Sequence, residues 1–302
     1  SNAKENFRII KVDKDTQQVL SGAVFDLTGK IDGKNQTVQV TTGSDGVAAF
    51  SKLEPGEYEL REVTAPSGYK IDSKIYKITV TEDLEIVCTE GGLTINKNDE
   101  GVYAAQIGNE RDTTSITVNK VWDDSENQDG KRPEGVEVEL YANGNPTGKK
   151  VTLDEANQWT HTWEDLDEKA NGEKIIYSVK ETRETDGKVT FDGAKYTVAY
   201  ADDQKGHITV TNTHIPSTVD IEGSKTWDDQ GNEGARPEKI TIHLKADGEE
   251  KDSKEVTAEA GWKWKFENLP EYSAGTKITY TVVEDTVENY VTSKGEGAYD
   301  IK

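Results

Sequence analysis

Three lysines lie in strand-like segments on the side that is predicted to be buried, where an unprotonated amine could act as a nucleophile. Side chains alternate between the two faces of a β-strand, so Lys120 shares a face with Ile116 and Val118. Lys11 and Lys225 occupy the same position in similar segments. Burial disfavours the charged ammonium, because it loses its hydration in an apolar interior. The neutral amine that remains can attack a carbonyl carbon.

Each of these lysines is matched by a glutamate on the apolar face of a later segment: Glu62, Glu181 and Glu284. Two of them are also matched by an asparagine on the apolar face of a closing segment, Asn109 or Asn212. A glutamic acid kept protonated by apolar surroundings can hydrogen-bond the asparagine carbonyl oxygen and shuttle protons while a tetrahedral intermediate collapses. This chemistry releases ammonia and leaves a Lys–Asn isopeptide bond.

A purely structural explanation of the same residues stays open at this point. The pairs could be ordinary buried Lys–Glu ion pairs with asparagine nearby, or a bulge could shift the alternation by one residue. Cys88 is the only cysteine, so no intramolecular disulfide can form, and we expect it to be a buried strand residue without chemistry. An isopeptide bond that closes most of a domain would constrain the unfolded chain as a long-loop disulfide does, by roughly 4–5 kcal/mol.

The positioning elements come from an internal repeat, because Lys225 lies 105 residues after Lys120 within a similar heptapeptide. A looser first copy is centred on Lys11. Short alternating runs separated by turn signals such as Asp247-Gly248 are typical of antiparallel β-sandwiches. We therefore predict an all-β chain of three tandem β-sandwich domains at residues 4–113, 114–216 and 217–302. Their short junctions predict a semi-rigid rod.

Three motifs of the second domain are characteristic: Val118-Asn119-Lys120-Val121-Trp122-Asp123-Asp124, Gly130-Lys131-Arg132-Pro133 and Val210-Thr211-Asn212-Thr213. On these motifs, the second and third domains resemble Cna protein B-type domains. The first domain resembles the prealbumin-like domains of SpaA-type pilins and of adhesins, and its residues 53–69 are similar to the pilin E-box. The resemblance implies inverse immunoglobulin-like sandwiches, display on the cell wall of a Gram-positive bacterium, and isopeptide bonds that form without an enzyme.

Carried over by position, the resemblance assigns roles to the residues above: reacting lysines Lys11, Lys120 and Lys225, catalytic acids Glu62, Glu181 and Glu284, and acceptors Asn109 and Asn212. The third domain departs from the pattern, because its last segment holds no asparagine. By the alternation its acceptor would be residue 303. We expect Lys225 to be unlinked unless Asp300 substitutes in a different register, and the third domain to be the least stable.

The acidic composition argues against some classes of binding partner. With 58 acidic and 36 basic residues the formal net charge is −22, which argues against nucleic acid and anionic membrane surfaces. No apolar run approaches the roughly 18 residues of a membrane span. We expect no metal or cofactor, since the histidines form no metal-binding pair and the acidic segment 123–130 should be a solvated turn. Trp264 is the best candidate for an exposed aromatic side chain, because its counterpart in the repeat is His161.

These observations predict a structural stalk segment of a cell-surface adhesin or minor pilin rather than an enzyme with a diffusible substrate. The alternative is a domain that binds collagen or another host matrix ligand directly. A polymerising pilin backbone ranks lower, since neither an LPXTG sorting motif nor an evident pilin motif occurs. We expect an extracellular monomer whose partners are host matrix or other pilus subunits. Its signal peptide and anchor should lie outside this sequence, and Ser1-Asn2-Ala3 looks like the remnant of a cleaved tag.

Overall fold

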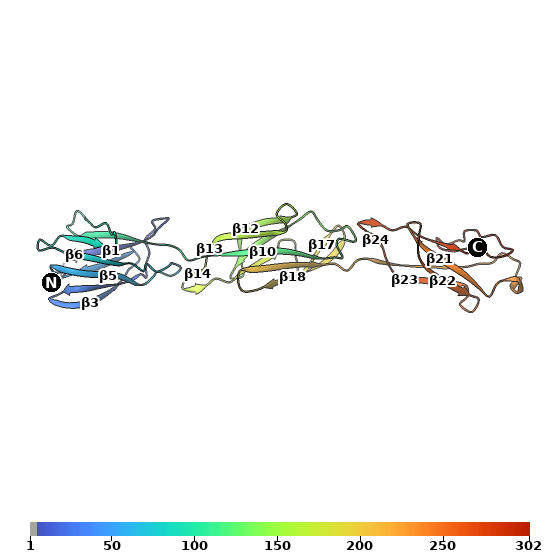
Figure 1. The fold of residues 1–302 in the computed structure, drawn as a ribbon, viewed down its shortest axis with the longest axis horizontal. Helices are drawn as coiled ribbons and strands as arrows, with labels where there is room; N and C mark the ends of the chain where they lie inside the picture. Colours follow the sequence, from blue (N-terminus) through green and yellow to red (C-terminus); the bar gives the residue numbers. More distant parts are fainter. Residues whose placement is uncertain (1–4) are drawn as a thin grey trace. The chain divides into compact units, whose positions relative to one another are not determined.

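The computed structural model describes residues 5–302, so Ser1-Asn2-Ala3 lies outside the described residues. Figure 1 shows that strands make up almost all of the regular structure. Among the described residues the helical structure is one 3-10 turn, η1 (Glu233–Ala235). No helix within residues 5–302 combines the length and the apolar character needed to cross a membrane. The prediction of an all-β chain is confirmed.

Residues 5–109 form two sheets. The strands are β1 (Glu5–Asp13), β2 (Val24–Ile31), β3 (Lys34–Thr41), β4 (Val47–Ser51), β5 (Gly56–Thr64), β6 (Ile75–Val80), β7 (Ile86–Glu90), β8 (Asn96–Lys97) and β9 (Tyr103–Asn109). One sheet has the order β4-β1-β9-β8 and the other β3-β2-β5-β6-β7. The apolar side chains of both sheets form one core that includes Phe7, Phe25 and Leu60.

A five-stranded sheet, a three-stranded sheet and a short hairpin follow between residues 113 and 213. The strands are β10 (Thr113–Asp123), β11 (Gly135–Ala142), β12 (Asn145–Asp154), β13 (Thr160–Asp167), β14 (Lys169–Ala170), β15 (Glu173–Lys174), β16 (Tyr177–Glu181), β17 (Lys188–Phe191), β18 (Ala194–Asp202) and β19 (His207–Thr213). The larger sheet has the order β13-β10-β19-β18-β17, the smaller one β12-β11-β16, and β14 pairs with β15.

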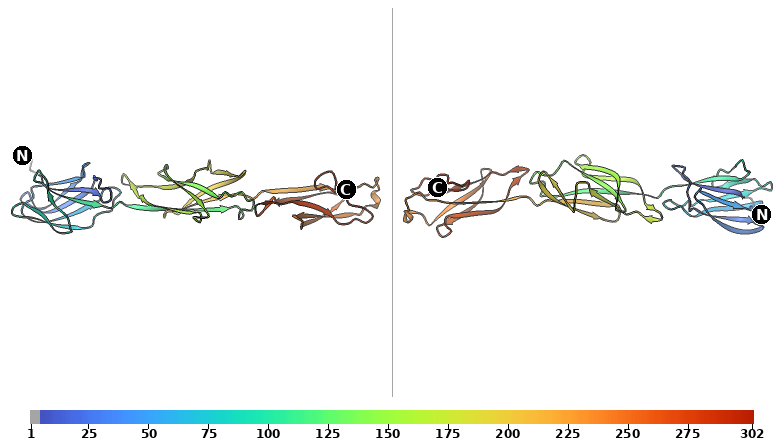
Figure 2. Two further views of the ribbon diagram at one scale, coloured as in Figure 1. Left: turned by 90° about the horizontal axis from the view of Figure 1, so that it is seen from above. Right: turned by 180° about the vertical axis from the view of Figure 1, so that it is seen from behind.

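The last part of the chain has fewer strands. They are β20 (Thr218–Ser224), β21 (Lys239–Ala246), β22 (Glu249–Thr257), β23 (Lys263–Pro270), β24 (Tyr272–Ser273), β25 (Thr276–Lys277) and β26 (Tyr280–Glu284). Their sheets are β20-β23, β22-β21-β26 and the hairpin β24-β25. The views in Figure 2 show this part in orange and red. β21 and β22 are joined at Asp247 and Gly248, whose φ values of 49° and 88° give the left-handed two-residue turn that suits a hairpin.

The first and last strands of residues 5–109 lie side by side and run parallel, although they are far apart in the sequence. β1 pairs with β9 from Phe7 opposite Tyr103 to Asp13 opposite Asn109, which sets Lys11 opposite Ile107. In the third part of the chain, Lys225 forms an isolated parallel bridge with Ile301. β10 and β19 are likewise neighbours in their sheet. The opening strand of each part therefore meets the segment that closes it.

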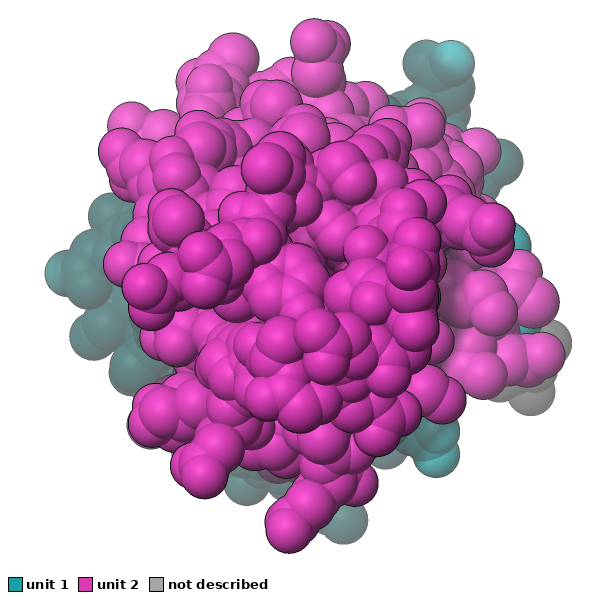
Figure 3. Space-filling view, turned by 90° about the vertical axis from the view of Figure 1, so that its right-hand side faces the viewer, with its two compact units in different colours: residues 1–117, 141–146, 162–178 teal, residues 118–140, 147–161, 179–302 magenta. Residues whose placement is uncertain are grey.

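By the contacts between its residues the chain divides into two compact units, coloured separately in Figure 3. Unit 1 comprises residues 1–117, 141–146 and 162–178, and unit 2 comprises residues 118–140, 147–161 and 179–302. Each matched set of lysine, glutamate and asparagine lies within one unit. The domain boundaries after residues 113 and 216 stay predictions.

The core of residues 5–109 gives a first testable prediction. Leu60 on β5 is fully buried, whereas Ile75 on the neighbouring strand β6 is 51% exposed. Leu60→Ala should lower the free energy of unfolding of this part by roughly 2–5 kcal/mol, because it leaves a cavity between the sheets. Ile75→Ala should change it by less than about 1 kcal/mol. Calorimetric melting of the full chain compares the two, and equal shifts would contradict the assigned core.

Candidate functional site

The structure places all three predicted lysines in the protein interior. Lys11 on β1 is fully buried, Lys120 on β10 is 6% exposed, and Lys225 directly after β20 is 5% exposed. The predicted alternation is therefore confirmed for the three opening strands. Since apolar neighbours precede each lysine on the same face, the strand itself carries the amine into the core.

The first set brings Lys11, Glu62 and Asn109 into direct contact. Lys11 Nζ lies 3.3 Å from Glu62 Oε1 and donates to Asn109 Oδ1. Asn109 Nδ2 donates to both carboxylate oxygens of Glu62, at 2.9 and 3.1 Å. No side-chain atom of Lys11 or Glu62 reaches the surface. Burial lowers the pKa of the Lys11 amine, although the Glu62 carboxylate acts in the opposite direction.

The second set holds the same residue types with a free amine. Asn212 Nδ2 donates to Glu181 Oε1 at 3.2 Å, and both residues are buried. Among residues 5–302, no hydrogen-bond partner reaches the buried Lys120 Nζ, Glu181 Oε2 or Asn212 Oδ1. Burial lowers the pKa of Lys120 to about 7 and raises the pKa of Glu181, so it favours the neutral form of each group. Burial thus favours the two protonation states that nucleophilic attack requires.

The third set is an ion pair. Lys225 Nζ lies 2.9 Å from Glu284 Oε2 and donates to Oε1 at 3.1 Å, with both side chains almost fully buried. Thr292 Oγ1 also donates to Glu284 Oε1. In the first set, Lys11 lies opposite Ile107, and the acceptor Asn109 follows Ile107 by two residues. In the third set, Lys225 lies opposite Ile301, so the position equivalent to that of Asn109 is residue 303. This is the register predicted from the sequence.

Asp300 does not take the acceptor position in the third set. Its carboxylate accepts the backbone N–H groups of Ser224 and Gly297, at 2.9 and 2.8 Å. These contacts hold the side chain between the end of β20 and the turn before Ile301. A substitute reaction of Asp300 with Lys225 would need the different register that the structure does not have.

The orientation of the two asparagines differs from the sequence-based expectation. We expected the glutamic acid to hydrogen-bond the asparagine carbonyl oxygen, but Glu62 and Glu181 each meet the amide nitrogen instead. In the first set the carbonyl oxygen faces Lys11 Nζ. The acid therefore lies beside the nitrogen that would leave as ammonia, where it can deliver a proton.

A residue with left-handed backbone anchors the main chain of each lysine, a feature that the sequence did not reveal. The three lysine N–H groups donate to the carbonyl oxygens of Gly46, Trp159 and Trp262, at 2.8, 2.8 and 2.7 Å. These residues have φ values of 74°, 59° and 57°. Glycine adopts this conformation freely, whereas it costs about 1–2 kcal/mol for tryptophan. The tryptophans are held there by edge-to-face packing on Trp122 and Trp227.

A tryptophan also covers the amine in the second and third sets. Lys120 Nζ lies 4.2 Å from the ring centroid of Trp122, and the guanidinium of Arg132 lies 5.3 Å from the same ring. Arg132 in turn pairs with the buried carboxylate of Asp124. The same arrangement recurs in the third part with Lys225, Trp227, Arg236 and Asp229. The sequence signals of this cluster were the repeated Trp-Asp-Asp and Arg-Pro motifs, at residues 122–124 and 132–133 and again at 227–229 and 236–237.

Three other expectations need correction. The segment 123–130 is a turn as expected but is only partly solvated, because Asp124 and Asp129 are buried and pair with Arg132 and His214. Trp264 is 5% exposed and packs in the core of the third part, so it is not a surface aromatic. Cys88 is only half-buried, and its Sγ donates to the backbone oxygen of Glu90.

The histidines make separate contacts. His214 bonds Asp129 and the backbone oxygen of Lys195, while His207 pairs with Asp203 and His243 with Glu250 and Asp285. Within residues 5–302 no group of three or more histidine, cysteine, aspartate or glutamate side chains is placed to hold a metal ion.

Two known proteins are similar to this chain in sequence, and both are surface proteins or adhesins by name. A collagen adhesin of Staphylococcus aureus is 48% identical over 180 residues, which are 59% of this chain and 14% of the adhesin. The trypsin-resistant surface T6 protein of Streptococcus pyogenes serotype M6 is 31% identical over 104 residues, which are 32% of this chain and 19% of that protein. The chain thus spans less than a fifth of either relative.

Solved structures and family models agree on the fold. The structure of two B repeat units of the collagen binding protein of S. aureus is 33% identical with a TM-score of 0.54, and the match covers 99% of this chain and 73% of that one. The prealbumin-like fold domain matches residues 5–91, and the Cna protein B-type domain matches residues 116–213 and 221–302. The prediction of tandem β-sandwich domains of these types is confirmed. The chain belongs to the Cna protein B-type domain family.

Proposed function

We propose that this chain is a stalk segment of a Gram-positive cell-surface adhesin or minor pilin, stabilised by isopeptide bonds Lys11–Asn109 and Lys120–Asn212. The observation that carries the proposal is a buried amine beside a buried Asn–Glu pair in two successive parts of the chain. The relatives named above are a collagen adhesin and a surface protein. The chain would therefore work outside the cell, and its chemistry would be one reaction of the protein with itself.

The reaction needs no group beyond the three side chains. Lys11 Nζ attacks Cγ of Asn109 and forms the new N–C bond, while the bond from Cγ to Nδ2 breaks. The proton that Nζ loses passes through the Glu62 carboxyl to Nδ2, and ammonia leaves. Glu62 lies within 3.3 Å of both nitrogens, so a single carboxyl can accept from one and donate to the other.

The position of the bond explains why it suits a stalk. Lys11 and Asn109 are 98 residues apart but lie on adjacent parallel strands, the first and the last of their part. Tension applied through the chain ends enters at β1 and leaves at β9. A covalent link between these strands would carry that tension past all intervening hydrogen bonds.

Direct binding of a host matrix ligand is the second candidate, and the name of the relative that is 48% identical favours it. Within residues 5–302, the exposed large apolar side chains of this chain, such as Ile176 and Val291, are scattered along the sequence and form no single patch in one element. Single, scattered apolar side chains of this kind are normal on protein surfaces. The stalk proposal therefore ranks first.

The intact mass tests the cross-links directly. The purified chain should be lighter than its sequence by two molecules of ammonia, with linked peptides that contain Lys120 with Asn212 and Lys11 with Asn109. Glu181→Ala should lose only one ammonia, because its second set lacks the proton carrier. Glu164→Ala changes an exposed glutamate on β13 and serves as the control that loses both. If the measured mass of the unsubstituted chain equalled the mass of its sequence, the cross-linking mechanism would be refuted.

The pH dependence of stability tests whether Lys120 is a desolvated amine. Asn212→Ala leaves this lysine unlinked, with a folded-state pKa lowered by burial to about 7 from 10.5. Between these values the unfolded state binds more protons, so the free energy of unfolding should rise with pH, by at most roughly 1.4 kcal/mol per unit. The linked chain lacks this titration. Urea unfolding of both proteins from about pH 7.5 to about pH 9.5 gives the comparison, and parallel curves would contradict the assignment.

The register of Lys225 and Ile301 gives a third test. Adding asparagine, threonine and histidine after Lys302 copies residues 212–214 and sets the asparagine at the acceptor position. The extended chain should lose a third ammonia, and the lowest of its melting transitions should rise. Adding alanine, threonine and histidine instead controls for the longer strand. A third loss in the alanine version would mean that another side chain is the acceptor.

A further inference from the structure

The last strand of the first part has an open edge. In the sheet order β4-β1-β9-β8, β1 covers one side of β9 along its whole length. On the other side, the two-residue strand β8 pairs only with Tyr103 and Ala104. Within the described residues 5–302, residues 105–108 of β9 therefore have no strand partner on that side. An unpaired edge of this kind is a template for a further strand.

The second part of the chain shows what a covered edge looks like. Its sheet has the order β13-β10-β19-β18-β17, in which β10 and β19 correspond to β1 and β9. There β18 pairs antiparallel with β19 from Thr197 opposite Thr213 to Asp202 opposite Ile208. The asparagine-bearing strand of the second part is thus paired on both sides, whereas β9 is paired on one.

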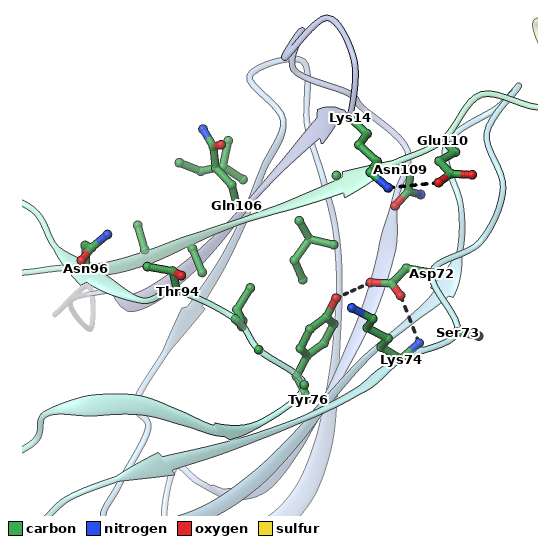
Figure 4. A pocket seen from close by; sticks show the side chains of 18 of the residues that line it. Lys14, Asp72, Ser73, Lys74, Tyr76, Thr94, Asn96, Gln106, Asn109 and Glu110 are labelled. Carbon is green, nitrogen blue, oxygen red and sulfur yellow. Dashed lines mark hydrogen bonds and ion pairs between the residues drawn. The ribbon is translucent and has the colours of Figure 1, made fainter.

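A groove of about 930 Å³ runs along the open edge of β9. Residues 70–76 and 91–98 form its other walls. Figure 4 shows Gln106 and Asn109 on β9, with Asp72 and Tyr76 on the opposite side and Asn96 towards one end. Gln106 and Gly108 are exposed, and Gly108 has no side chain to keep another backbone away. The volume is within the range of peptide and ligand pockets.

The charge along the groove has the opposite sign to the charge of the chain. Lys70, Lys74 and Lys97 line it, are exposed, and form no ion pair within the described residues. The two acids of the groove are already engaged, since Glu110 pairs with Lys14 and Asp72 accepts from Tyr76 Oη and the Lys74 N–H. The chain as a whole carries −22. Free lysines in this setting favour an anionic partner.

We propose that the open edge of β9 is a strand-addition site that binds an extended, acidic peptide segment of a partner protein, antiparallel to β9. The peptide would take the place that β18 has beside β19, and its carboxylates would pair with the three lysines. Main-chain hydrogen bonds to an edge supply affinity, and side-chain pockets and charges supply selectivity. The site depends on the fold of residues 5–109 and not on the cross-link.

The test uses the full chain and a nine-residue synthetic peptide in which glutamate alternates with threonine or valine. The peptide should bind to the chain and protect the groove-facing amides of residues 105–108 from hydrogen exchange. A strand bonds each neighbour through alternate residues only. Of two peptides that are N-methylated at odd or at even positions, one should therefore lose binding and the other keep it. If both N-methylated peptides bound as well as the unmodified peptide, the proposal would be overturned.

Lysine variants test the charge contribution. Lys70→Glu with Lys74→Glu should weaken binding about tenfold or more, because two attractions become repulsions. Lys30→Glu with Lys34→Glu changes two exposed lysines outside the groove and should leave binding unchanged. Equal loss in both variants would mean nonspecific attraction and would overturn the site. So would binding of heparin, an anionic polysaccharide, with no binding of the peptide.

Discussion

The structure depends on a desolvated lysine amine held between the first and last strands of a sandwich. An amine in such a place cannot keep its charge without a partner, because no water replaces its hydration shell. The three parts of the chain show different arrangements of the same position. Lys11 touches both an asparagine and a glutamate, Lys120 has no hydrogen-bond partner among the described residues, and Lys225 forms an ion pair.

The surrounding residues serve to hold this amine in place. A left-handed residue accepts the lysine N–H in every part. In the last two parts an indole covers the amine, and an arginine over the same indole pairs with an aspartate. Removing solvent strengthens each of these electrostatic contacts and also makes an unreacted amine unfavourable. A neutral amide would remove that difficulty, which gives a physical reason for the reaction to run in one direction once ammonia has left.

The closing strand needs only one neighbour to present its asparagine. β9 and β19 both carry the asparagine beside the opening strand, but their far edges differ, one open and one covered by β18. The far edge can thus differ while the lysine, glutamate and asparagine keep their places. With the proposed bond and the proposed peptide site, one strand would serve stability on one side and recognition on the other.

The sequence by itself determined the all-β class, the repeat, the face on which each lysine lies and the alternation from which an acceptor at residue 303 is predicted. Alternation and internal repetition are local properties, so they can be read without coordinates. The sequence could not show which atom of Asn109 faces Glu62, that Asp124 is buried against Arg132, or that Trp264 lies in the core. These features depend on contacts between segments far apart in the chain. The open edge of β9 likewise exists only because β8 is short, and strand pairing on both sides of β9 is decided by tertiary packing.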